Sequence, residues 1–309
     1  MAGTRNAGDR GRRLSSYVVR ILSIQSSVAY GYVGNSAATF PLQRLGHEVW
    51  PVVTVHFSNH TGYGQWRGTV LDPAVVADVI EGINDRGVLG SADAVLTGYQ
   101  GSPGVAEVVL STVRRVRALN PAAVYCCDPV LGDVGRGFFV APGIPELMRD
   151  EVVPTADICT PNAFELAFLA GGAARTAEDG DPFETMAQVL EAADRLRARG
   201  PRTVLVTSVE HADLGPDEIA MIAVDDTGAF EVRTPRLPLS VNGAGDVTAA
   251  LFLAHLTTDG IEAALARTAS SVFAILETTH RLGAREIRLI DAQEQIAAPA
   301  CEFPVTRLR

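Results

Sequence analysis

The stretch Gly243-Ala244-Gly245-Asp246 combines residue types that can bind an anion and act on it. It runs directly into an apolar, helix-forming segment over 249–256. A backbone that turns through two glycines into a helix points several free N–H groups at one spot. This positive end of the helix dipole suits a phosphate. Asp246 would lie beside that anion in the first turn, and we interpret it as a base for phosphoryl transfer.

The glycine turn alone is also compatible with two simpler roles. Asp246 could be an ordinary acid in the first turn of a helix, a place where the dipole favours negative charge. The glycines could also form a methyltransferase-like loop, but that loop follows the first strand, whereas this turn is near the C-terminus. The turn by itself does not decide between these roles and phosphoryl transfer.

A second set of residues could bind a small, hard cation. Asp128, Asp133, Asn162 and Glu165 offer the oxygen ligands that Mg²⁺ takes together with waters and phosphate oxygens. Asp128 and Asn162 each stand next to a proline and could simply form turns. Glu165 lies three residues after Asn162 and could be a capping carboxylate. Taken together with the glycine turn, the set favours metal and phosphate chemistry.

The elements that must position these residues alternate along the chain. Apolar segments predict strands over 18–25, 48–55, 94–97, 123–127, 157–159 and 203–207, and a hairpin over 218–224 and 228–234. Helices are predicted over 35–45, 73–85, 102–119, 162–170, 182–199, from the glycine turn to 256, and 261–279, with Asn35 as the cap of the first. This alternation predicts an α/β fold with a central, mostly parallel sheet and helices on both faces.

Polar residues fall where the predicted strands end. They are Ser26, Thr54, Tyr99, Asp128, Thr160, Thr207 and Ser208. Ligands of such folds bind beyond the carboxyl ends of the strands, so we expect these residues at one edge of the sheet, beside the glycine turn. The loop over 56–66 is long and rich in aromatic and polar residues, which indicates a binding or covering role.

Composition narrows the class of function. The 309 residues carry a net charge of −10, which disfavours nucleic acid and anionic membranes as partners. All 26 basic residues are arginine. The lack of lysine excludes a Walker-A phosphate loop and an enzyme that holds pyridoxal phosphate as a lysine Schiff base.

Cysteine usage and hydropathy point to a cytoplasmic protein. The four cysteines show no zinc spacing, and we expect buried, reduced thiols. No apolar run approaches the roughly 20 residues of a membrane span. We divide the chain into a disordered N-terminal tail over 1–17, a single domain over 18–290 and a C-terminal tail over 291–309.

Five blocks of residues, in order, resemble the pyridoxal kinase family of the ribokinase-like superfamily. They are Ser26 with Gly31 and 34–38, 54–61, 127–133, 160–165 and 243–246. The resemblance extends from about 20 to 256 and more weakly to 279. It implies a three-layer αβα ribokinase-like fold, and the short span over 35–48 leaves no room for the large lid of the sugar kinases.

The resemblance implies an ATP-dependent kinase of vitamin B6 salvage. Its members phosphorylate the 5′-hydroxymethyl group of pyridoxal, and often of pyridoxine and pyridoxamine. The family uses Mg²⁺ and a monovalent cation such as K⁺, and it implies a homodimer. The remaining alternatives are a hydroxymethylpyrimidine or sugar kinase of the same fold, and a B6-binding protein without catalysis.

The resemblance also implies roles for individual residues. Asp246 matches the catalytic base, with Gly243, Ala244 and Gly245 as the anion hole. Ser26, Thr54 and Tyr99, with Asp246, match the substrate pocket. The ATP side is matched by Asp128, Thr160, Glu165, Thr207, Ser208, Arg236 and Leu237, and the metal by Asp128, Asp133, Asn162 and Glu165. Because helix amides surround it, we expect Asp246 to have a low pKa.

Overall fold

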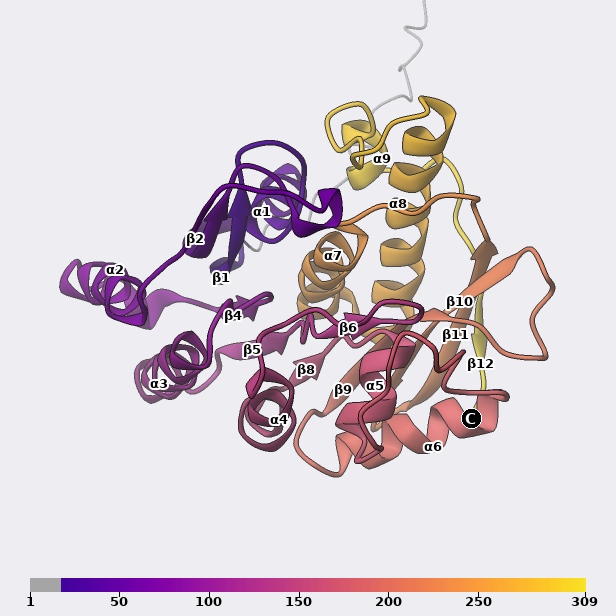
Figure 1. Cartoon of the computed structure of the whole chain (residues 1–309), viewed down its shortest axis with the longest axis horizontal. Coiled ribbons are helices and arrows are strands. Elements are labelled where there is room, and N and C mark those ends of the chain that lie inside the picture. The colour runs from indigo at the N-terminus through magenta and orange to yellow at the C-terminus, as the bar shows by residue number, and fades with distance from the viewer. Residues whose placement is uncertain (1–17) are drawn as a thin grey trace, which may run out of the picture.

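A ten-stranded sheet forms the centre of the computed structural model, which describes residues 18–309 (Figure 1). Its strands are β1 (Arg20–Val28), β2 (Glu48–Phe57), β3 (Gly68–Val70), β4 (Ala94–Thr97), β5 (Val124–Cys127), β8 (Ile158–Cys159), β9 (Thr203–Val209), β10 (Glu218–Asp225), β11 (Gly228–Pro235) and β12 (Val305–Arg307). Their order across the sheet is β12-β11-β10-β9-β8-β5-β4-β1-β2-β3. The strands from β9 to β2 pair in parallel, and the strands at both ends are antiparallel.

Helices cover both faces of this sheet, as the alternation of elements predicts. The longer ones are α1 (Asn35–Arg44), α2 (Pro73–Asp85), α3 (Pro103–Leu119), α5 (Ala163–Leu169), α6 (Met186–Arg197), α7 (Ala244–Asp259) and α8 (Ile261–Arg281). Successive side chains of a strand point to opposite faces. In β1, Ile21 belongs to the apolar core that includes residues of α1, α7 and α8, and Leu22 belongs to the core on the other face, which includes residues of α2, α3, α5 and α6. The three-layer αβα fold is therefore confirmed (Figure 1).

The first strand and helix differ in detail from the prediction. β1 continues to Val28, so Ser26 lies inside the strand rather than after it. Asn35 does not cap α1, because Gly34 occupies the cap position. The Asn35 side chain is buried and donates hydrogen bonds to the carbonyl oxygens of Gln25, at 3.1 Å, and Val52, at 2.9 Å. It thus joins β1 to β2 beneath the helix.

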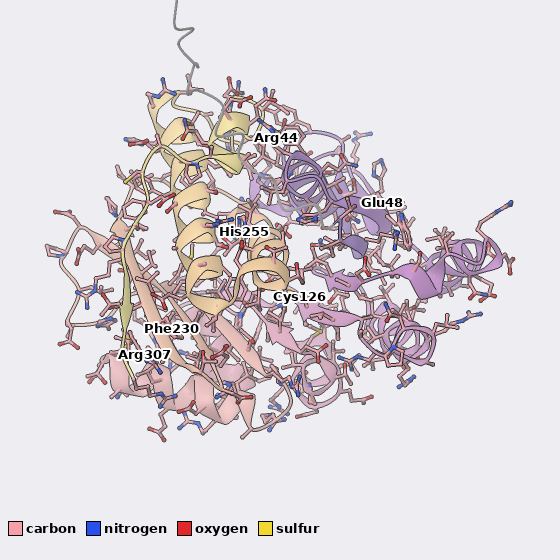
Figure 2. The ribbon with its side chains drawn as sticks, turned by 180° about the vertical axis from the view of Figure 1, so that it is seen from behind. Arg44, Glu48, Cys126, Phe230, His255 and Arg307 are labelled. Carbon is pink, nitrogen blue, oxygen red and sulfur yellow. The ribbon has the colours of Figure 1, made fainter. Side chains whose placement is uncertain are left out.

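The predicted tail over 291–309 is instead part of the domain. It contains α9 (Gln293–Ala297) and β12, which pairs with β11 as an edge strand. Seen from behind, Arg307 of β12 lies beside Phe230 of β11, with its guanidinium carbon 5.6 Å from the ring centroid (Figure 2). The strand is too short for its pattern to stand out in the sequence. The predicted tail over 1–17 lies outside the described residues.

The segment between β5 and β8 contains elements that the sequence does not predict. A small hairpin of β6 (Gly132–Asp133) and β7 (Gly137–Phe138) stands apart from the main sheet, and α4 (Ile144–Leu147) follows it. The hairpin carries Asp133 to the carboxyl edge of the strands. Within residues 18–309, no helix combines the length and the apolar character that crossing a bilayer requires.

Candidate active site

A cavity of about 210 Å³ lies beyond the carboxyl ends of the parallel strands. Most of the predicted site residues line it: Ser26, Tyr99, Asp128, Asp133, Thr160, Asn162, Glu165, Thr207, Gly243, Ala244, Gly245 and Asp246. They come from β1, from the loops after β4, β5 and β8, from β6, from β9 and from the starts of α5 and α7. The fold therefore brings these distant residues together, as the positions of the predicted strand ends indicate. Thr54, Ser208, Arg236 and Leu237 do not line this cavity.

The glycine turn forms the N-terminal cap of α7. Gly243 is the cap residue and has a φ of 90°, in the left-handed region that favours glycine. A Cβ atom at this position would stand 1.9 Å from the carbonyl oxygen of Tyr32. The first N–H groups of a helix have no partner within the helix, and those of Ala244 and Gly245 belong to residues on the cavity wall. The geometry suits an anion at this end of the cavity.

Asp246 also lies on the cavity wall, in the first turn of α7. Our expectation of a low pKa is wrong, because burial raises the pKa of Asp246 to about 6. The backbone amides of Gly34 and of Asp246 itself pull the pKa down, but less than burial raises it. A carboxylate of this kind is a stronger base than an exposed aspartate and is still largely ionised at neutral pH.

Asp128 lies deeper in the cavity and is only 5% exposed. Its Oδ1 accepts a hydrogen bond from the Thr160 hydroxyl at 3.2 Å. Burial raises the pKa of Asp128 well above its usual value, and the neighbouring carboxylates of Asp246 and Glu165 raise it further. The carboxyl groups of Asp128, Asp246 and Glu165 therefore lie close together at this cavity, in a chain that contains no lysine.

Asn162 and Glu165 form a reciprocal cap at the start of α5, which is the local role that the sequence left open. The Glu165 amide donates to Asn162 Oδ1 at 2.9 Å, and the Asn162 amide donates to Glu165 Oε2 at 3.0 Å. Glu165 Oε1 also accepts the amide of Leu131 at 2.7 Å, and Asn162 Nδ2 donates to the carbonyl of Gly132 at 2.8 Å. Burial raises the pKa of Glu165 to about 7, although the hydrogen bonds from backbone amides lower it. The pair therefore holds the loop that leads to Asp133.

On the cavity wall near β1 and β2, the lining threonine is Thr61 and not the predicted Thr54. Thr54 is fully buried, and its hydroxyl donates to the carbonyl oxygen of Tyr99 at 2.7 Å, so it supports the wall from behind. Thr61 lines the cavity instead, together with His60. Both belong to the 56–66 loop, whose composition indicates a binding or covering role. The sequence thus identifies the loop but not the residue.

Two residues beside the cavity have a backbone conformation that is rare outside glycine. Val130, on the wall, has a φ of 46°, and Ser208, after Thr207, has a φ of 53°. Such positions cost on the order of 1–3 kcal/mol each and gather at functional sites. No sequence signal marks Val130. Arg136 and Asn242, also missed, line the cavity, and Arg136 Nη1 donates to Asn242 Oδ1 at 3.3 Å.

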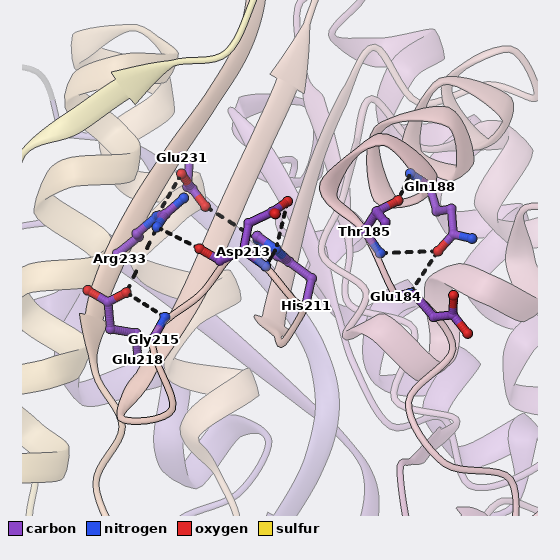
Figure 3. A network of polar contacts seen from close by, with 9 residues as sticks. All are labelled: Glu184, Thr185, Gln188, His211, Asp213, Gly215, Glu218, Glu231 and Arg233. Atoms are coloured by element: carbon purple, nitrogen blue, oxygen red, sulfur yellow. Dashed lines mark hydrogen bonds and ion pairs between the residues drawn. The ribbon is translucent and has the colours of Figure 1, made fainter.

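A polar network holds the loop that follows Ser208 (Figure 3). Arg233 on β11 donates to Glu231 Oε2 at 3.0 Å and to the carbonyl oxygen of Asp213 at 3.2 Å. The His211 side chain is fully buried, with Nε2 3.6 Å from Glu231 Oε1. In the same region Arg236 forms an ion pair with Glu210 at 2.9 Å. The network ties the end of β9 to β11. β11 leads directly to Arg236 and Leu237, which the family resemblance assigns to the ATP side.

The chain is similar to known kinases over most of its length. Residues 49–288 match the family described as phosphomethylpyrimidine kinase. Pyridoxal kinase PdxY of Rubrobacter xylanophilus is 59% identical over 292 residues, 94% of this chain and 98% of that protein. The corresponding protein of Leifsonia xyli is 57% identical over 291 residues, 94% of this chain and all of that protein (100%). A structure of pyridoxal kinase from Leishmania donovani with ADP and pyridoxine has a TM-score of 0.85 and 30% identity, over 94% of this chain and 99% of that one.

Proposed function

The chain belongs to the pyridoxal kinase family, and from this premise we propose how its cavity carries the reaction. The enzyme transfers the γ-phosphoryl group of ATP to the 5′-hydroxymethyl group of pyridoxal, with pyridoxine and pyridoxamine as further acceptors. One observation carries the assignment of the site. The N-terminal amides of α7 and the carboxylate of Asp246 meet in one cavity, which Ser26, Tyr99, Asp128 and Thr160 also line.

Asp246 is the group suited to accept the proton of the acceptor alcohol. Phosphoryl transfer depends mainly on positioning and on stabilising the charge of the moving group, with one carboxylate to take the proton. The raised pKa of Asp246, about 6, makes it a better acceptor of that proton. The amides of Gly243, Ala244 and Gly245 would stabilise the phosphoryl charge, because they are already oriented and need not reorganise.

The acidic residues of the cavity fit a divalent cation. Mg²⁺ commonly binds one or two carboxylates and completes its shell with waters and substrate phosphates. Asp128 and Asp133 line the cavity, and Asp246 and Glu165 are near enough to Asp128 to raise its pKa. Mg²⁺ would neutralise the phosphate charge when bound. Glu165 and Asn162 would contribute by holding the loop, since amides already occupy most of their acceptor positions.

We also propose a homodimer formed through the β3 edge of the sheet. Val75 and Val79 of α2 are 50% and 47% exposed and lie one helical turn apart. Trp66, just before β3, and Val70, in β3, are 46% and 40% exposed. β3 is the last strand of the sheet, so its outer edge has no strand partner among the described residues. Exposed apolar side chains next to a free strand edge favour burial against a second copy.

The cysteines support a reducing, cytoplasmic setting for the enzyme. Cys126, Cys127 and Cys159 are buried with free thiols, as expected, whereas Cys301 is exposed. Free thiols persist in reducing compartments.

An ADP-release assay with several acceptors tests the proposed substrate. The purified protein is supplied with ATP, Mg²⁺ and one of pyridoxal, pyridoxine, pyridoxamine, hydroxymethylpyrimidine or ribose. We expect pyridoxal to give the highest kcat/KM. Hydroxymethylpyrimidine is the second candidate, because residues 49–288 match the phosphomethylpyrimidine kinase family. Turnover of hydroxymethylpyrimidine or ribose alone would refute the assignment of the pocket.

A further inference from the structure

Glu286 follows α8, and its carboxylate joins two loops from the N-terminal part of the chain. The residue is 7% exposed. Oε2 accepts the backbone N–H of Tyr32 at 3.2 Å, and Oε1 accepts the hydroxyl of Tyr63 at 2.7 Å. Oε1 also lies 2.9 Å from Nε2 of His60. No sequence pattern marks this residue, because its partners are 223 to 254 positions away.

The hydrogen bonds of Glu286 determine which nitrogen of His60 carries a hydrogen. An ionised carboxylate only accepts hydrogen bonds, so Nε2 of His60 carries the hydrogen. The rings of His60 and Tyr63 lie with centroids 4.7 Å apart, and the guanidinium of Arg285 lies 4.7 Å from the Tyr63 ring. The hydrogen bond to Glu286 is the largest cause that raises the pKa of Tyr63 to about 12. Charge-assisted bonds of this kind are stronger than neutral ones.

Two partners of Glu286 flank Thr61, a residue of the cavity wall, along the chain. Thr61 begins a short 3₁₀ turn that ends at Tyr63, and His60 is the residue before it. His60 and Tyr63, on either side of Thr61, bind the same carboxylate oxygen. Because His60 and Thr61 line the cavity, the position of Glu286 sets where this part of the wall lies.

The second loop connects Glu286 to the catalytic turn. Gly31 leaves the space for the carboxylate, since a Cβ there would stand 2.2 Å from Oε2. The next residue, Tyr32, presents its carbonyl oxygen to Gly243, and Gly34 directs its amide at the carboxylate of Asp246. The carboxylate therefore holds the loop that abuts the start of α7.

Glu286 is itself firmly placed. The neighbouring Ile287 and the nearby Leu289 are fully buried, and they pack with Val247 and Leu251 of α7. A buried carboxylate with three donors, next to side chains in the core, can transmit a defined position to both loops.

We propose that Glu286 is a positioning residue for the acceptor side of the reaction. It aligns the Thr61 turn and the Tyr32 loop around the acceptor alcohol without touching the substrate. This inference depends on the proposed function, which assigns that side of the cavity to the B6 vitamer.

The test compares Glu286→Gln with Glu294→Gln, using pyridoxal and ATP as varied substrates. Glutamine keeps the size of the side chain but removes the charge and replaces one acceptor oxygen by a donor. We expect the pyridoxal KM of Glu286→Gln to rise about tenfold, the effect of losing one charge-assisted hydrogen bond, with the ATP KM within about twofold of wild type. Glu294 is exposed and pairs with Arg44, so its substitution should change neither constant.

Tyr63→Phe gives a second, milder variant that removes one donor and keeps the ring. We expect its pyridoxal KM to rise in the same direction, and the double variant with Glu286→Gln to show less than the sum of the two effects. A fall in Tm with unchanged pyridoxal KM in the soluble variants would mean a purely structural role and overturn the proposal. If the wild-type protein itself does not phosphorylate pyridoxal, the proposed function fails instead.

Discussion

The carbonyl oxygen of Tyr32 lies against Gly243, at 1.9 Å from where a Cβ would be placed on that glycine. This contact fits the β1–α1 loop onto the N-terminus of α7. Gly243 also has a φ of 90°. Both features require glycine, so the two segments can keep their relative position only if residue 243 has no side chain.

Gly243→Ala should therefore impair catalysis severely. The left-handed conformation costs a residue with a Cβ about 1–2 kcal/mol, and relief of the clash must move either the Tyr32 loop or the start of α7. A displacement of about 1 Å costs on the order of a hundredfold in rate, so we expect kcat/KM to fall by about that factor. Steady-state kinetics on the soluble variant measures the loss.

Gly82→Ala provides the matched control for this substitution. Gly82 lies inside α2, and a Cβ there would meet nothing within 4 Å. Alanine should leave the kinetics unchanged and stabilise the helix by about 0.5–1 kcal/mol. Wild-type kcat/KM in Gly243→Ala would show that the turn tolerates a side chain and that the contact with Tyr32 does not control the rate.

Asp246→Asn should abolish most of the turnover while nucleotide binding persists. The amide cannot accept the proton of the alcohol, and general-base catalysis contributes about a hundredfold to ten-thousandfold. We expect kcat to fall about a thousandfold and the Kd of ATP, measured by calorimetry, to stay within a few-fold. Asp259→Asn, at the other end of α7, is the control. Near wild-type kcat in Asp246→Asn would remove this residue from the role of base.

Asn162→Ala and Glu165→Ala should both raise the Mg²⁺ concentration at half-maximal rate. Each substitution releases the loop that carries Gly132 and leaves backbone groups without partners, at a cost of about 1–3 kcal/mol each. A purely capping role would lower Tm without changing the metal titration. Both measurements on each variant, with the exposed Glu191→Ala as control, separate these outcomes.

Val75→Glu combined with Val79→Glu should convert the proposed dimer into a monomer. A stable interface buries about 800 Å² on each partner, and two charges inside it would have to lose their hydration. Light scattering coupled to size exclusion gives the mass of the 32.7 kDa chain or its double. Leu282→Glu, 50% exposed after α8, is the control. A wild-type monomer at micromolar concentration would exclude this assembly.

The sequence predicts the order of the elements well because apolar periodicity and caps are local signals. Pro73–Asp85 and Ala94–Thr97 match their predicted bounds. Strand ends are less certain, which is why Thr54 and not Thr61 was expected on the cavity wall. Properties that depend on contacts between distant segments are still harder to predict from the sequence. The raised pKa of Asp246 depends on burial by distant segments, and the bonds of Glu286 depend on how both ends of the chain meet.

His255 should make the stability of the protein depend on pH. Its side chain is 10% exposed on α7, labelled in Figure 2, and Nε2 is buried without a hydrogen-bond partner among the described residues. Burial lowers the pKa of His255 to about 4, with a further lowering by Arg267 and His47 and an opposing effect of Asp259.

The sign of this dependence follows from proton uptake. Between about pH 6.5 and 4 the unfolded chain binds a proton at His255 and the folded chain does not. The contribution of neutral His255 to the free energy of unfolding is therefore complete above pH 6.5. It is lost as the pH falls, by about 2–3 kcal/mol at pH 4. Urea unfolding of wild type and His255→Leu at pH 7 and pH 4.5 should show a smaller loss in the variant. His280→Gln, at an exposed position on α8, should behave as wild type. Equal losses in wild type and His255→Leu would assign the acid sensitivity to other groups.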